Sequence, residues 1–137
     1  MQPKFGFREH AHTADWELEV WAPDLATLLE QAARGMYAMS GVKMNASSPQ
    51  ERSLVMHAPD AESLLVRFLT ELLWLEQKDG LAIDHFSINV EKDYSLWAEL
   101  CGAPILSLDK EIKAVTYHNL NVETTPQGLR VYIVFDV

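Results

Sequence analysis

The sequence is short of cysteine and of basic residues, and each shortage excludes a class of protein. Cys101 is the single cysteine, so an internal disulfide framework and a thiolate zinc site are both excluded. Lysine and arginine number 11 against 20 aspartates and glutamates, which gives a net charge of -9. Because affinity for nucleic acid comes mainly from basic side chains, this balance argues against a large phosphate-binding face. Any contact with RNA is therefore expected to run through a partner.

Long apolar runs and glycine-rich loops are also missing. No run approaches the roughly 18 apolar residues of a membrane helix, and residues 1–10 lack the apolar core of a signal peptide. We therefore expect no membrane association and a cytoplasmic location. With only six glycines the chain has no phosphate-binding loop, and no serine or cysteine lies in a nucleophile elbow. The residues alone favour a protein that is not an enzyme.

Two copies of the tripeptide Ala-Pro-Asp, which interrupts regular secondary structure, divide the first half of the chain. Ala22-Pro23-Asp24 and Ala58-Pro59-Asp60 each precede a leucine-rich segment with apolar residues at helical spacing. Asp24 and Asp60 are suited to cap the first turn of the two helices. The first helix is expected to end near Ser40-Gly41, and Gly80 suits the left-handed position that ends the second.

The other segments alternate apolar and polar residues, as strands with one buried face do. The order is strands, helix, strand, helix and then a run of strands. This order predicts an α+β fold in one domain, residues 1–137, with two helices packed on one face of a mixed, largely antiparallel β-sheet. We expect strands at 5–8, 16–21, 52–57, 86–91, 94–100, 112–123 and 129–137, and the strands at 86–91 and 94–100 should form a hairpin across Lys92-Asp93.

Carboxylates lie at two predicted strand ends. Asp15 directly precedes the strand that begins at Trp16, and Asp136 ends the last strand beside Val137. Oxygen ligands of this kind suit a hard divalent cation such as calcium, magnesium or manganese. An aspartate at a strand end is also commonly a cap or a solvated charge. The spacing alone leaves both interpretations open.

Other candidate groups are weaker. His10 and His12 would share a strand face and could hold zinc with a third ligand, but the sequence does not identify one; packing of one histidine and exposure of the other is the simpler interpretation. Glu17 and Glu19 are interpreted as a solvated strand face. Lys113 and His118 fall on opposite sides of a predicted strand, so they do not form a pair there.

Several motifs together resemble the archease family over nearly the whole chain. The resemblance rests on the segment from residue 24 to residue 39 and on four motifs, which are His12-Thr13-Ala14-Asp15, Glu71-Leu72-Leu73-Trp74-Leu75-Glu76, Glu111-Ile112-Lys113-Ala114-Val115-Thr116-Tyr117-His118 and Phe135-Asp136-Val137.

The resemblance implies an accessory protein of the RtcB-type RNA ligase of tRNA splicing and RNA repair. Such a protein promotes guanylylation of the ligase's active-site histidine, helps the ligase to turn over repeatedly and broadens its nucleotide use. The resemblance also implies a metal site made by Asp15, Asp136 and an oxygen of Val137. Lys113 and His12 are implied as further functional residues, for partner contact or activation.

One departure from the family pattern concerns the first motif. Many members carry an acidic residue directly before it, where this chain has Ala11, and Glu9 is displaced by two positions.

The main alternative to an accessory protein of the ligase is a chaperone-like interaction module without any ligase dependence. A metal-dependent hydrolase that uses Asp15 and Asp136 is a third hypothesis.

Overall fold

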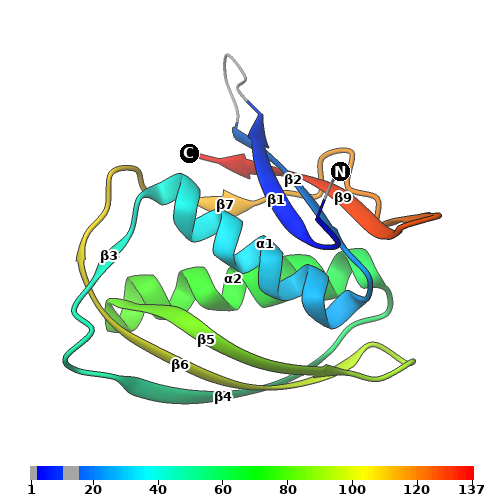
Figure 1. Ribbon diagram of the computed structural model, residues 1–137. Helices are drawn as coiled ribbons and strands as arrows, with labels where there is room; N and C mark the ends of the chain where they lie inside the picture. The colour runs from blue at the N-terminus through cyan, green and yellow to red at the C-terminus, as the bar shows by residue number, and fades with distance from the viewer. Residues whose placement is uncertain (1–2, 11–15) are drawn as a thin grey trace.

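The computed structural model describes residues 3–10 and 16–137, and within these ranges the chain forms two helices and nine strands (Figure 1). The helices are α1 (Leu25–Ser40) and α2 (Ala61–Asp79). The strands are β1 (Gly6–His10), β2 (Trp16–Ala22), β3 (Lys43–Met44), β4 (Gln50–His57), β5 (Leu81–Val90), β6 (Ser95–Ser107), β7 (Ala114–Val115), β8 (Glu123–Thr125) and β9 (Gly128–Asp136).

The first sheet has five strands in the order β1-β2-β9-β7, with β8 also paired to β9. Its centre is the antiparallel pair of β2 and β9, in register from Trp16 opposite Phe135 to Ala22 opposite Leu129. Because β2 occupies one edge of β9 along its length, β7 and β8 share the other edge. Leu18 and Val20 on β2 are fully buried, as their alternation predicts.

The second sheet has four strands and is built on the long strand β6. Strand β5 pairs with one edge of β6, and β3 and β4 pair with the other. The register shifts between Ile83 and His85, which places a β-bulge in β5. The backbone of β5 comes so close to Gly102 of β6 that a Cβ there would lie 1.9 Å from the Ala82 carbonyl oxygen.

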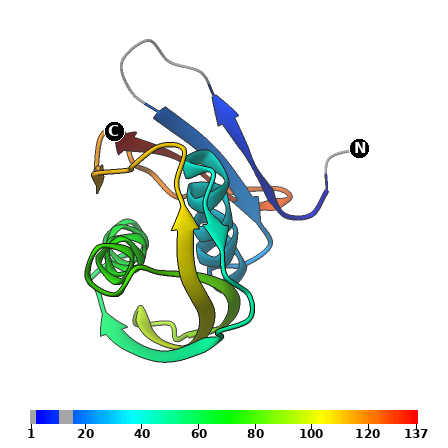
Figure 2. The same cartoon turned by 90° about the vertical axis from the view of Figure 1, so that its left-hand side faces the viewer.

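The two helices lie between the two sheets (Figure 1), and Figure 2 shows the same layering from the side. Helix α1 packs against β2 and β5, and α2 packs against β5 and β7. The predicted α+β class with two helices is confirmed, and every strand pairing in the described ranges is antiparallel. The strands, however, are divided between two sheets instead of forming one. A helix covered on both sides needs a wide apolar surface, and α1 has buried residues at Leu28, Leu29, Ala32, Ala33 and Met36.

The predicted helix ends are confirmed. Asp24 accepts a hydrogen bond from Thr27 N at 2.8 Å, and Asp60 accepts one from Ser63 N at 2.7 Å, so both cap a first helical turn. Gly41 and Gly80 follow the helices with φ values of 65° and 60°, in the left-handed region. No helix in the described part of the chain is both long and apolar enough to cross a membrane.

The predicted long strand over 112–123 is wrong. Only Ala114–Val115 pairs with β9 as β7, and the chain then leaves the sheet. Leu120 N donates to Tyr117 O at 3.1 Å, and Asn119 takes a φ of 52°, so a turn interrupts the alternating pattern. The chain returns to β9 only at β8.

Candidate functional site

Four strand ends meet at one edge of the five-stranded sheet. There β1 ends at His10, β2 begins at Trp16, β9 ends at Asp136 and β7 begins at Ala114. The register places Trp16 opposite Phe135 and Ala114 opposite Asp136. Segments from the two ends of the sequence and from residues 111–118 therefore converge at this edge.

Asp136 combines an anchored backbone with an exposed side chain. Its carbonyl oxygen accepts a hydrogen bond from Lys113 N at 2.8 Å. Its neighbour Phe135 is fully buried, so the alternation of β9 turns Asp136 away from the core. With the other described residues the Asp136 carboxylate forms no hydrogen bond or ion pair, whereas Val137 is half-buried against the core. The backbone of Asp136 is thus anchored, and its carboxylate is accessible to a ligand.

Lys113 lies at this edge, as its hydrogen bond to Asp136 shows, and its side chain is exposed. Thr116 secures the segment that follows, since its N and its Oγ1 donate to Val134 O at 3.1 and 2.8 Å. A second basic side chain is close by, with Lys110 Nζ lying 5.4 Å from the centre of the Trp16 ring. Two exposed lysines therefore flank the end of β9.

The burial of Glu19 differs from what the sequence predicts. It was predicted on a solvated face, but only 6% of it is exposed. Its Oε1 lies 3.0 Å from Nε2 of His10 and 3.7 Å from a terminal nitrogen of Arg8, and the His10 ring lies against that of Tyr132. The strand register brings these side chains together, and no local pattern encodes it. A buried carboxylate with a histidine partner is the residue pair that sequence reasoning missed.

Asp15 and His12 lie outside the described residues, so their predicted roles remain predictions. In the described part of the chain no group of three or more histidine, cysteine, aspartate or glutamate side chains could hold a metal ion. The oxygen donors of Asp136 suit a hard cation better than zinc.

These features define the class of protein: a small α+β chain whose two helices lie between antiparallel sheets, with an exposed aspartate where the strand ends of one sheet meet. Residues 7–137 match the model of the Archease protein family (MTH1598/TM1083). The chain belongs to the archease family, which confirms the resemblance found in the sequence.

Relatives of similar length support this assignment. The chain is 31% identical over 134 residues to the protein archease of Methanosarcina barkeri, with 92% of each chain covered. It is 32% identical over 131 residues to that of Thermococcus kodakarensis, covering 89% of this chain and 91% of the relative. The solution structure of Methanobacterium thermoautotrophicum protein 1598 superposes with a TM-score of 0.74 at 23% identity, covering 96% of this chain and 99% of that one, and so shares the fold.

Proposed function

We propose that this protein is a cytoplasmic, non-catalytic accessory factor of an RtcB-type RNA ligase. It would promote guanylylation of the ligase and its repeated turnover in tRNA splicing and RNA repair, with a bound divalent cation. The observation that carries the proposal is membership of the archease family across residues 7–137. The exposed, anchored carboxylate of Asp136 supports the metal part of it.

The strand register supports Asp15 and Asp136 as joint ligands. Trp16 pairs with Phe135, and the two strands are antiparallel. Asp15 directly precedes Trp16 in the sequence, and Asp136 directly follows Phe135. Each aspartate is thus the sequence neighbour of one residue of this pair. We propose that they bind calcium, or magnesium or manganese, together with an oxygen of Val137.

The cation, Asp136 and Lys113 would have different roles at this edge of the sheet. When bound, the cation supplies electrostatic stabilisation of phosphate charge. The hydrogen bond from Lys113 N keeps the end of β9 in place, so that Asp136 is held ready for the ion. The exposed Lys113 side chain offers a positive charge for a phosphate or for an acidic group of the ligase. The net charge of -9 favours docking on a basic surface and disfavours RNA as a direct competitor.

A guanylylation assay of the purified ligase, with and without this protein, tests the proposal. The wild-type protein should accelerate the reaction, and Asp15→Asn and Asp136→Asn should abolish the acceleration. Asp84→Asn is a matched control, because Asp84 is exposed on β5 in the other sheet. Calorimetric titration with Ca²⁺ should show binding to the wild type and the control only.

Each part of the proposal has its own refuting result. No acceleration by the wild type contradicts the activator role, and suppression of client aggregation without ligase would favour the chaperone-like alternative. Full acceleration by Asp136→Asn contradicts the metal site. Turnover of a phosphoester by the isolated protein contradicts the non-catalytic role.

A further inference from the structure

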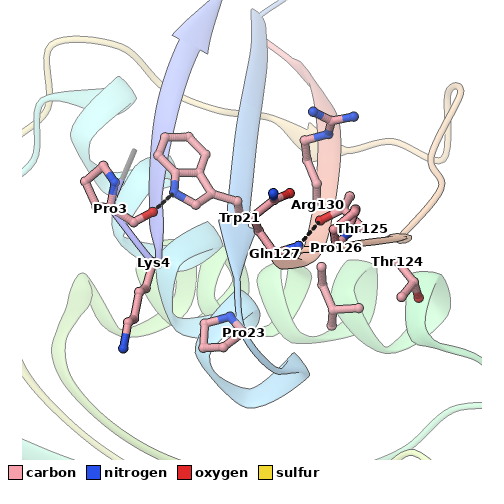
Figure 3. Close-up of a pocket in the computed structure, with 10 residues that line it drawn as sticks. Pro3, Lys4, Trp21, Pro23, Thr124, Thr125, Pro126, Gln127 and Arg130 are labelled. Atoms are coloured by element: carbon pink, nitrogen blue, oxygen red, sulfur yellow. Dashed lines mark hydrogen bonds between the residues drawn. The ribbon is translucent and has the colours of Figure 1, made fainter. Parts of the chain in front are cut away.

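A cavity of about 730 Å³ lies at the opposite end of β2 and β9 from Asp136 (Figure 3). Its walls come from the segment before β1, from the two central strands and from the turn between β8 and β9. Trp21 and Trp16 are five residues apart on β2, which corresponds to roughly 17 Å along an extended strand. The cavity is therefore separate from the proposed metal site, and binding of a ligand in it would not require the metal.

The apolar wall of the cavity is rigid. Trp21 Nε1 donates to the carbonyl oxygen of Pro3 at 2.9 Å, and a Cβ on Gly6 would lie 2.9 Å from Cζ2 of the indole, so backbone packs against the ring. Pro23 and Pro126 add two further side chains with little conformational freedom. A preformed wall of this kind costs little entropy when a planar ligand binds to it.

The polar part of the cavity is positively charged. Lys4 and Arg130 line it, and none of its ten described lining residues is an aspartate or glutamate, although the whole chain carries a net charge of -9. In Figure 3 the two cationic side chains lie on opposite sides of the Trp21 ring, with Gln127 between the ring and Arg130. The charged groups of the lining therefore favour an anion over a cation.

Arg130 has donor capacity to spare. It lies opposite Trp21 in the strand register. One terminal nitrogen is 3.4 Å from Glu123, a long and half-exposed ion pair, and its buried Nε has no acceptor among the described residues. Native structures rarely leave a buried donor unpaired. A modest rotation of the guanidinium toward a bound anion would supply the missing acceptor.

We propose that this cavity binds a free nucleotide, with the base against Trp21 and the phosphate at Arg130. The volume is in the range of small-molecule sites. Indole rings bind bases by stacking, which contributes in a base-tolerant way, and arginine suits phosphate oxygens. The Gln127 amide and the Thr124 hydroxyl line the same cavity and offer hydrogen bonds to base or ribose. The acidic remainder of the chain disfavours a long RNA strand, which would extend beyond the cavity.

Titration of the purified protein with AMP, ATP and GTP, followed by calorimetry and tryptophan fluorescence without added metal, tests the proposal. Adenosine and ribose 5-phosphate, which each carry half of the recognised chemistry, should bind more weakly than AMP. Arg130→Met should weaken AMP binding about tenfold, because the phosphate loses a charge-assisted hydrogen bond. Lys43→Met is the matched control, since Lys43 is exposed on β3 in the other sheet.

The remaining measurements separate binding from folding. Trp21→Phe should remove most of the fluorescence change, while calorimetry should still detect binding to the smaller ring. Thermal unfolding of each variant shows whether a loss of affinity reflects a loss of structure. Absence of nucleotide binding by the wild type at millimolar concentration overturns the proposal, as does unchanged affinity in a folded Arg130→Met variant. Tight binding of a single-stranded RNA hexamer without binding of free nucleotides would overturn it in favour of an RNA site.

Discussion

Replacement of Gly102 by alanine tests the close approach of β5 to β6. The added Cβ would lie 1.9 Å from the Ala82 oxygen, 2.8 Å from its carbonyl carbon and 2.9 Å from Ile83 Cα. All three are backbone atoms, so no change of side-chain rotamer can relieve the contact. Only a separation of the two strands can do so.

The expected cost is about 4 kcal/mol. Carbon–oxygen contacts between strands are normally about 3.3–3.6 Å, so the strands must move apart by about 1.4 Å. Ladder hydrogen bonds tolerate only a few tenths of an ångström, so two or three are lost at about 1 kcal/mol each. Overpacking adds about 1–3 kcal/mol. For a chain of this size, this corresponds to a fall in Tm of more than roughly 10 °C.

Urea unfolding with Gly80→Ala as control measures this cost. Gly80 has nothing within 4 Å of the added methyl but has a φ of +60°, so that variant should lose only about 1–2 kcal/mol for its backbone conformation. Both variants should keep the wild-type m-value. A stability loss in Gly102→Ala no larger than that in Gly80→Ala would refute the steric reasoning.

Two further predictions concern the helices. Burial, and then the nearby Glu111, raise the pKa of Glu76 above its ordinary value of 4.5. The folded protein thus holds this proton more tightly than the unfolded chain, so the stability contribution is full below about pH 4 and is lost as the pH rises through the raised pKa. Glu76→Gln should therefore be more stable than wild type at pH 7.5 but not at pH 4 in urea unfolding; an equal difference at both pH values would contradict this. Asp24→Ala should cost about 1 kcal/mol because Thr27 N loses its acceptor, and a Tm within 1 °C of the wild type would show that the cap contributes nothing.

Local chemistry made some of the fold predictable from the sequence. Asp24, Asp60 and Gly80 act within one turn of their own helix, so a short stretch of sequence contains the information for their contacts. The hairpin of β5 and β6 was predictable for the same reason, because adjacent alternating segments pair across a tight turn.

Long-range pairing was the part that the sequence did not reveal. Alternation marks a strand but does not say which sheet it joins, so one sheet was predicted where the structure has two. It also does not show where pairing stops, as at Val115. Glu19 is covered by Arg8, His10 and Tyr132, which come from two other strands, so its burial had no signal in the residues beside it.

The candidate site was predictable in part. The motifs identified the family and directed attention to Asp136 and Lys113, which the structure joins by a hydrogen bond. Asp15 and His12 fall outside the described residues, and their roles are still predictions. The cavity at Trp21 carries no sequence motif, because its lining is assembled from three separate segments.

The helix layer separates the two outward faces of the sheets. Each sheet turns one face toward the helices and the other outward. A helix layer is about 10 Å thick, so the outward faces are on the order of 20 Å apart and point in opposite directions. A molecule bound to one of them does not obstruct the other. The architecture therefore permits bridging, in which one small chain holds two larger bodies on opposite flanks.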